Sequence, residues 1–234
     1  RMAEQVCVVL GVGPGNGAAF ARRFDREGFR VACLARSGDV IEPLARELGE
    51  GIAVRCDAAE PDDVRRALDE VQAAWGRVDV LVYNAGSGVF GSVDDVDEAD
   101  LEHTWRINTL GLFAAARACL PGMRTRGHGQ IVVIGATASV RGGAGFAAFA
   151  PAKAAQRSLA QSMARKLGPE GIHVGLLIID GVIDGPRARS MMSARGDEAF
   201  LQPADIADAV VALVRQPRSA WTFEMDLRPF TEKW

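Results

Sequence analysis

The chain has 234 residues, of which 48% are hydrophobic and 24% are charged. This composition is typical of a globular protein, and the length suits one large domain with a sizeable core. The formal net charge of −3 gives no electrostatic reason to expect a nucleic acid or an anionic membrane as a partner. Four cysteines without a CxxC pair predict buried free thiols, and they favour neither a metal site nor a disulfide framework.

We expect a cytoplasmic protein. The most apolar short stretch, VGLLII at 174–179, is far too short to span a bilayer, and no secretory leader is visible. Free thiols also fit a reducing compartment.

The first half of the chain alternates short apolar runs, typical of buried strands, with longer amphipathic runs, typical of helices. We expect strands at 5–10, 29–35, 52–56 and 78–86, the last of them running into a loop. Helices are expected at 16–28, 41–49 and 61–76. Pro61 and the acidic residues after it are typical of a helix N-terminus.

The second half continues the alternation. It predicts a long helix from about Glu98 to Met123, a strand at 129–135, an alanine-rich helix at 146–168, a strand at 172–179, a helix at 203–217 and a last strand at 221–227. This order favours a parallel sheet with helices on both faces. No segment has the pattern of a second domain, so residues 1–234 are expected to form one, with the irregular stretch 180–202 as a candidate substrate lid.

A glycine-rich turn, LGVGPGNGAAF at 10–20, follows the first expected strand. The next helix offers unpaired N–H groups at its start, and glycine lets a pyrophosphate approach the backbone. Two framings of the glycines stay open, GxxxGxG and GxGxxA, and a tight turn without a ligand is the alternative. We predict that Gly11, Gly15, Asn16 and Gly17 bind a dinucleotide.

The end of the second expected strand indicates which dinucleotide is bound. NAD sites often place an acidic residue there for the ribose 2′-hydroxyl, whereas a basic residue suits a 2′-phosphate. Here uncharged Ala35 is followed by Arg36 and Ser37. Since arginine makes bidentate, charge-assisted contacts to phosphate, these residues favour NADP(H) over NAD(H), with a merely solvated Arg36 as the alternative.

Several motifs in order resemble the short-chain dehydrogenase/reductase family over nearly the whole chain. They are LGVGPGNG at 10–17, Asp57 in RCDAAEPDDV, Asn84, Ala85 and Gly86 in VDVLVYNAG, Asn108 in RINTLG, and Lys153 in FAPAK. The resemblance implies a single-domain α/β Rossmann fold, doubly wound around a mostly parallel sheet of about seven strands. It further implies a nicotinamide cofactor and a homodimer or homotetramer.

The resemblance also implies roles for single residues. Asp57 would contact the adenine, Lys153 would hold the nicotinamide ribose, and Val182 and Ile183 would flank the nicotinamide.

The departures from the family pattern fall on its chemistry. Alignment with the family places Ala136 where a serine binds the substrate oxygen, and Phe149 where a tyrosine exchanges a proton with it. Neither side chain donates a hydrogen bond, so Lys153 and Asn108 remain as the catalytic candidates. The chain thus resembles a divergent subgroup with Phe in place of the catalytic Tyr.

Such a site needs another proton source. Lys153, or a water held by Lys153 and Asn108, is the first candidate. The others are Thr137, Ser139, Ser87, Tyr83 and Asp180. Each has a structural alternative, because loop hydroxyls satisfy local backbone, a tyrosine suits the core and an aspartate suits a loop cap. The histidines lie away from the motifs, and we expect no metal site.

The substrate pocket is expected to be apolar and to receive a small molecule. Its predicted lining includes Ser87, Phe90, Thr137, Phe146, Phe149 and Asp180. The first hypothesis is an NADP(H)-dependent oxidoreductase that reduces an apolar carbonyl, imine or activated alkene with a non-standard proton source. The alternatives are a cofactor-binding pseudoenzyme, acting as a sensor or partner subunit, and a non-redox catalyst on the same scaffold.

Overall fold

Seven strands form one sheet in the order β3-β2-β1-β4-β5-β6-β9, and every neighbouring pair is parallel. The computed structural model describes residues 5–232. The strands are β1 (Val6–Leu10), β2 (Arg30–Ala35), β3 (Gly51–Arg55), β4 (Val80–Tyr83), β5 (Gly129–Ile134), β6 (Ile172–Ile179) and β9 (Glu224–Leu227). The predicted fold class is confirmed, and this sheet is parallel throughout.

The central strands have continuous apolar sequences because they are covered on both faces. Every residue of β1 is buried, and its neighbours β2 and β4 place Ala32 and Leu81 on either side of Val8. The four cysteines are buried and free, which confirms the prediction of buried free thiols.

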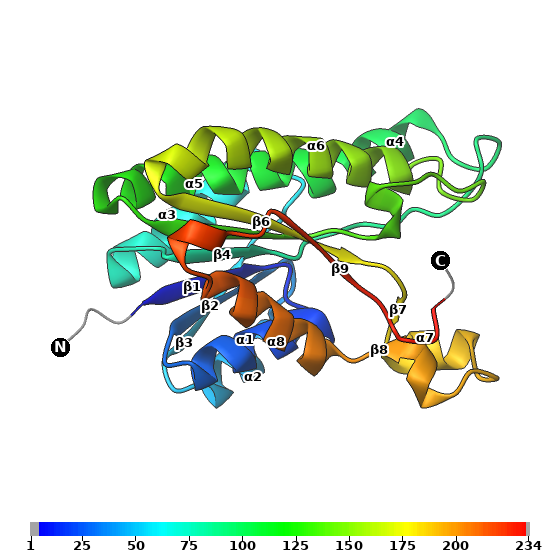
Figure 1. Ribbon diagram of the computed structural model, residues 1–234, viewed down its shortest axis with the longest axis horizontal. Coiled ribbons are helices and arrows are strands. Elements are labelled where there is room, and N and C mark those ends of the chain that lie inside the picture. The colour runs from blue at the N-terminus through cyan, green and yellow to red at the C-terminus, as the bar shows by residue number, and fades with distance from the viewer. Residues whose placement is uncertain (1–4, 233–234) are drawn as a thin grey trace.

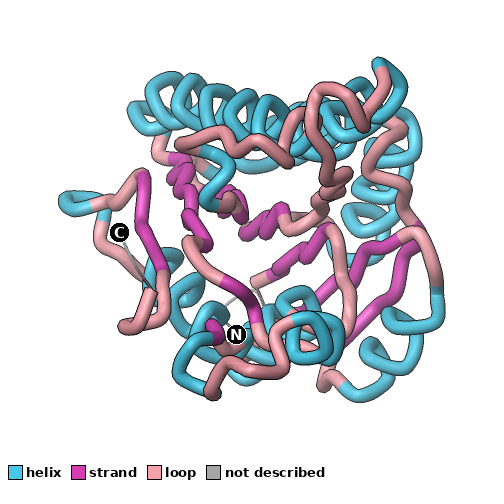
Figure 2. The backbone as a smooth tube through the Cα atoms, turned by 90° about the vertical axis from the view of Figure 1, so that its right-hand side faces the viewer, coloured by secondary structure: helices cyan, strands magenta, loops and turns pink. Residues whose placement is uncertain are grey.

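Two layers of helices cover the sheet (Figure 1). One face carries α3 (Pro61–Trp75), α5 (Gly111–Arg126) and α6 (Phe149–Leu167), and the other carries α1 (Asn16–Arg26), α2 (Gly38–Glu47) and α8 (Pro203–Val214). Alternate strand residues supply two separate cores, because Val8 packs toward the first layer and Val9 toward the second. Figure 2 shows the strands between these two layers.

The expected helix from Glu98 to Met123 is longer and less regular than its sequence indicates. It consists of α4 (Glu98–Trp105), a π-helical turn at Arg106–Leu110, and α5, which continues to Arg126. The Gly111 N–H donates to the carbonyl of Arg106, five residues back. This turn matters for the site because it contains Asn108.

The stretch 180–202 has more regular structure than expected. It contains β7 (Val182–Ile183), α7 (Pro186–Met191) and β8 (Phe200–Leu201), and β7 and β8 pair in parallel as a small second sheet. Arg189 secures the segment, since it pairs with Asp184 at 2.5 Å and with Asp197, and its guanidinium lies over the Phe200 ring at 4.4 Å. The proposed lid is therefore an ordered subsheet beside the main one.

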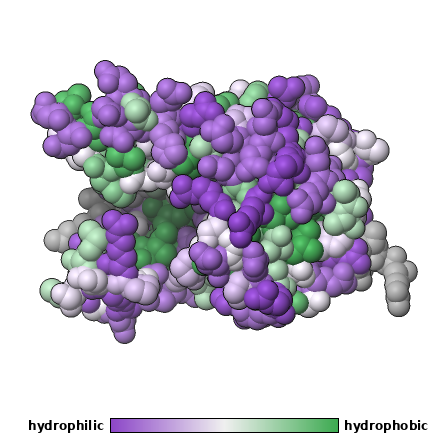
Figure 3. Space-filling view, turned by 180° about the vertical axis from the view of Figure 1, so that it is seen from behind, coloured by the Kyte–Doolittle hydropathy of each residue, from purple (hydrophilic) through white to green (hydrophobic). Residues whose placement is uncertain are grey.

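The strands of the main sheet all end at the same edge, because they are parallel. This edge faces right in Figure 1, where the chain leaves β6 for β7. From behind, Figure 3 shows the molecule hollowed at the corresponding left-hand end. In the part of the chain that the structure describes, no helix has both the length and the apolar character that crossing a bilayer requires.

Candidate functional site

A cleft of about 490 Å³ lies at the carboxyl ends of the first strands. Its lining includes most of the predicted cofactor residues, namely Gly11, Asn16, Gly17, Arg36, Ser37, Asp57, Asn84, Ala85 and Gly86, together with Ser87 from the predicted substrate pocket. These residues come from the loops after β1, β2, β3 and β4, so a parallel sheet is what brings them together.

The glycine loop separates into positions needed for packing and positions that leave space. Gly11 has φ +97°, and a Cβ built on it would lie 2.2 Å from the Ala85 nitrogen. A Cβ on Gly17 would lie 2.6 Å from the Cα of Val12, whereas Gly13 and Gly15 have nothing within 4 Å of theirs. Gly11 and Gly17 therefore hold the turn tight, and the backbone between them stays open to a ligand.

Asn84 fixes the loop after β4 against this turn. Its Nδ2 donates to the carbonyl of Gly11 at 2.7 Å, and its backbone N–H donates to the carbonyl of Leu10 at 2.8 Å. Asn16, at the start of α1, is buried, and its Oδ1 has no hydrogen-bond partner among the described residues. An unsatisfied buried acceptor at the cleft wall is the kind of group that a bound ligand or water satisfies.

Arg36 and Ser37 are exposed at the far end of the cleft, after β2. Ser37 caps α2, because its Oγ accepts from the Asp39 N–H at 3.1 Å. Asp57 is held in a turn, in which its Oδ1 accepts from the Ala59 N–H at 2.9 Å. This end of the cleft therefore combines a guanidinium, a helix N-terminus and a carboxylate.

Lys153 and Asn108 meet behind Gly86. A Cβ built on Gly86 would lie 3.4 Å from the Asn108 Oδ1 and 3.8 Å from the Lys153 Nζ. Asn108 is fully buried, and its Oδ1 has no partner among the described residues. Its Nδ2 donates to the carbonyls of Thr104 at 2.8 Å and Ser87 at 3.0 Å, which fixes the orientation of the amide.

The Lys153 side chain is almost fully buried, with 6% exposed. Its Nζ donates to the carbonyl of Ile134 at 2.9 Å and to the Oε1 of Gln156 at 3.0 Å. Burial lowers the pKa of Lys153 from its usual value to about 8, because the charged form loses its hydration. A lysine with such a pKa exchanges protons near neutral pH, so Lys153 stays a candidate proton source.

The aligned serine and tyrosine positions hold no polar side chain. Phe149 is the first residue of α6, and its ring lies 5.3 Å from Phe90 and 6.1 Å from Phe146 between centroids. The two loops behind these rings are joined, since the Gly91 N–H donates to the Gly145 carbonyl at 2.8 Å. The three rings form an apolar cluster at the N-terminus of α6.

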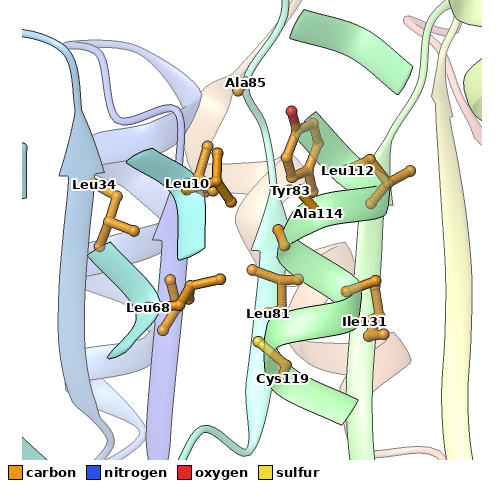
Figure 4. Close-up of a cluster of buried hydrophobic side chains, with 14 of the residues drawn as sticks. Leu10, Leu34, Leu68, Leu81, Tyr83, Ala85, Leu112, Ala114, Cys119 and Ile131 are labelled. Carbon is orange, nitrogen blue, oxygen red and sulfur yellow. The ribbon is translucent and has the colours of Figure 1, made fainter. Parts of the chain in front are cut away.

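Three of the candidate hydroxyls, those of Thr137, Ser139 and Tyr83, are engaged in other contacts. Thr137 donates to the Asp180 Oδ1 at 2.6 Å, and the buried Ser139 Oγ accepts from the Ala136 N–H at 3.0 Å. Tyr83 is fully buried and donates to the Ile107 carbonyl, and burial raises its pKa well above the usual value. Figure 4 shows Tyr83 among buried apolar side chains. Of the two interpretations of Tyr83, a proton source or a core residue, the structure supports the core residue.

Asp180 sits in a cluster of charges. Its carboxylate lies 3.2 Å from the guanidinium of Arg228 and 3.8 Å from that of Arg141, besides accepting from Thr137. Asp180 is therefore engaged in two ion pairs and one hydroxyl contact at the start of the segment after β6.

Ten predicted residues lie outside the lining of the main cleft: Gly15, Asn108, Lys153, Val182, Ile183, Phe90, Thr137, Phe146, Phe149 and Asp180. Val182 and Ile183 form β7, and Phe146 lines a separate open hollow of about 400 Å³. Among residues 5–232, no group of three or more His, Cys, Asp and Glu side chains is placed to hold a metal ion.

The structure also adds residues that the sequence did not indicate. His103 lines the cleft with Ile107, which corrects the expectation that the histidines lie away from the site. Gln156 contacts both Lys153 and Asn108. Its position one helical turn after Lys153 was the available signal, because residues three apart share a helix face.

A doubly wound parallel sheet with a glycine turn after its first strand defines the Rossmann class, the fold that binds dinucleotides at this edge. The model of the short chain dehydrogenase family matches residues 5–196. The chain belongs to the short-chain dehydrogenase/reductase family of oxidoreductases, whose fold implies a nicotinamide cofactor.

Relatives of nearly full length support this assignment. A 2-(R)-hydroxypropyl-CoM dehydrogenase of Xanthobacter autotrophicus is 32% identical over 228 residues, covering 90% of this chain and 91% of that protein. The crystal structure of a short-chain dehydrogenase from Rhodopseudomonas palustris has 36% identity and a TM-score of 0.84, covering 97% of this chain and 99% of that one. A metagenomic short-chain oxidoreductase in complex with NADP has 30% identity and a TM-score of 0.83, covering 96% and 97%.

Proposed function

We propose that this protein is an NADP(H)-binding oxidoreductase that reduces an imine, as its iminium ion, or an activated alkene with apolar substituents, because such acceptors need little acid assistance. One observation carries the proposal: α6 has Phe149 at the family's tyrosine position and, one turn later, a buried Lys153. Cofactor-holding groups are thus kept, while the proton-donating groups of the family pattern are replaced.

The residues present fit the cofactor. The open backbone near Gly13 and Gly15 leaves room for a pyrophosphate at the start of α1, where unpaired N–H groups favour an anion. Lys153 and the unpartnered Asn108 Oδ1 lie at the opposite end, where they would hold the nicotinamide ribose through its hydroxyls. The bound cofactor would supply the hydride, as in other nicotinamide enzymes.

The preference for NADP(H) rests on Arg36. It is exposed at the cleft end that follows β2, with Ser37 beside it. A guanidinium there matches a 2′-phosphate, and Ala35 offers no carboxylate for a ribose 2′-hydroxyl. The NADP in the metagenomic relative agrees with this preference.

The choice of acceptor follows from charge balance. Hydride addition to a carbonyl forms an alkoxide, which needs a proton at once, and no free hydroxyl stands at position 136 or 149. Hydride addition to an iminium carbon gives a neutral amine with no proton required. An activated alkene gives an enolate, which tolerates a slower proton from solvent or Lys153. Iminium ions and activated alkenes therefore fit this site best.

The first test is titration of the purified protein with NADPH and NADH, followed by cofactor fluorescence. Arg36→Ala should weaken NADPH about 10- to 100-fold, the size of a lost charge-assisted contact, and leave NADH unchanged. Arg46→Ala on α2 removes the same charge outside the cleft lining and is the matched control. Equal affinities for both cofactors would contradict the NADP(H) preference, and absence of binding would remove the oxidoreductase proposal.

A protein that binds the cofactor without turnover is the second candidate. It is favoured by the engaged states of Thr137, Ser139 and Tyr83, which leave little acid–base chemistry at the site. Tight NADPH binding with no oxidation of NADPH by cyclic imines, enones or aldehydes would support this candidate over the first.

A further inference from the structure

Gln156 joins two residues of the site that come from different helices. It is fully buried on α6. Its Oε1 accepts from the Lys153 Nζ at 3.0 Å, and its Nε2 donates to the backbone carbonyl of Asn108 at 2.8 Å. One amide therefore bridges a cation and a carbonyl, with a donor on one side and an acceptor on the other.

The bridge determines what Lys153 offers to the cleft. A lysine ammonium has three N–H donors, and Ile134 and Gln156 take two of them. Because Nζ lies close to Gly86, which lines the cleft, one N–H is left to serve a ligand there. The lysine is thus held in a single orientation.

The bridge also determines where a proton can travel. A water between Nζ and the Asn108 carbonyl would accept one proton and donate another, so it would pass protons along. A primary amide with both ends fixed has no acidic proton to release near neutral pH. A water on the backbone carbonyl of Asn108 therefore does not fit this arrangement, whereas the expected water held by Lys153 and the unpartnered Asn108 Oδ1 stays a prediction.

We infer that Gln156 is a positioning residue that fixes Lys153 and takes the place of a proton-relaying water between Lys153 and the Asn108 carbonyl. The role of Lys153 toward a ribose rests on the proposed function, but the bridge itself does not. In this arrangement Lys153 delivers one proton toward the cleft and regains it from the cleft side only.

Several charged groups on and near α6 form ion pairs with one another. Arg157 of α6 pairs with Glu224 of β9, and Asp180 after β6 pairs with Arg228 and Arg141. His103 of α4 is exposed in the cleft. Burial lowers the pKa of Lys153, and no charged group contributes to that shift. The side chain that contacts the Lys153 ammonium is the neutral amide of Gln156.

The inference is tested on the protein without cofactor, by NMR titration of ¹³C-labelled lysine. The chain has only Lys153, Lys166 and Lys233, so the spectrum is simple and Lys153→Met assigns the signal. Gln156→Met removes the acceptor and should lower the Lys153 midpoint by about one pH unit. Gln156→Glu places a carboxylate there and should raise it by one unit or more.

Opposite shifts at Lys153, with the exposed Lys166 unchanged, are the expected result. No shift, or shifts of the same sign in both variants, would overturn the positioning role. If Gln156→Met fails to fold by circular dichroism, the Gln156→Glu shift decides alone.

The relay is tested separately, by exchange of the Lys153 ammonium protons with solvent. Gln156→Ala opens space for water beside the Asn108 carbonyl, so exchange at Lys153 should become faster relative to Lys166. An unchanged exchange rate would show that Gln156 does not close a proton route. NADPH binding is measured independently on the same variants, so failure of the cofactor proposal and failure of this inference are distinguishable.

Discussion

Lys153 links the protonation of one side chain to the stability of the fold. Its pKa is about 8 in the folded protein and about 10.4 in an unfolded chain. The unfolded chain therefore binds the proton more tightly, and the buried charge destabilises the fold below pH 8. This destabilisation disappears as the pH rises from about 8 to about 10.4.

We predict that this contribution is lost in Lys153→Met. The free energy of unfolding of the wild type, relative to the variant, should rise by about 3 kcal/mol between pH 7 and pH 10.5. Urea unfolding at both pH values measures it, and the comparison cancels the titration of cysteines and Tyr83. Lys166→Met, at an exposed lysine, should show no such change, and a flat difference for Lys153→Met would contradict the lowered pKa.

The missing hydroxyls define a second prediction for single residues. Ala136→Ser combined with Phe149→Tyr should create NADPH-dependent reduction of aldehydes or ketones, because positioned acid–base groups contribute about 10²- to 10⁴-fold. NADPH oxidation with a panel of apolar carbonyls measures the gain. Adding Lys153→Met should abolish it, and no gain in a variant that still binds NADPH tightly would count against the alignment of these two positions.

At the scale of elements, the turn between β1 and α1 makes a third prediction. Gly11→Ala forces a Cβ to within 2.2 Å of the Ala85 nitrogen at a positive φ, and should lower stability by about 2 kcal/mol or more. Gly13→Ala has nothing within 4 Å of its Cβ, so it should fold normally yet weaken NADPH binding. Thermal unfolding and cofactor titration of both variants check the contrast, which equal effects would contradict.

The π-helical turn shows why an element can be predicted while its detail cannot. The apolar pattern from Glu98 onward indicates a helix, and a helix is present. The irregularity arises where Asn108 uses its side chain to bond the Thr104 carbonyl, which the regular helical ladder would otherwise use. A sequence window contains no signal for that competition.

The sequence predicts an irregular segment at 180–202 for a related reason. Strands of two residues such as β7 and β8 are too short to show a period, and they pair across 16 intervening residues (184–199). The contacts of Arg189 with Asp184, Asp197 and Phe200 depend on the folded chain as a whole.

For the whole molecule, the sheet and its two helical layers followed from the alternation of apolar and amphipathic runs. The motif positions around the cleft followed from the loops after parallel strands. Gln156 did not, because a glutamine on a helix has many roles, and only the packing of α6 against the π-helical turn gives it two partners. Local sequence patterns do not predict the role of a residue when that role depends on contacts between two distant elements.

The homodimer or homotetramer stays a prediction. Leu101 and Trp105 of α4 and Phe113 of α5 are each about two-fifths exposed, so these helices present apolar side chains on the surface. Such a surface is compatible with a second copy of the chain.

The parallel sheet has a practical consequence for protein engineering. The groups that would perform chemistry stand on loops and helix starts beyond the carboxyl ends of the strands, while the two cores lie between sheet and helices. A combinatorial library confined to positions 136 and 149 would thus sample new reactivities with little effect on the melting temperature set by those cores. In this fold, the positions that determine activity are separate from the core positions that determine stability.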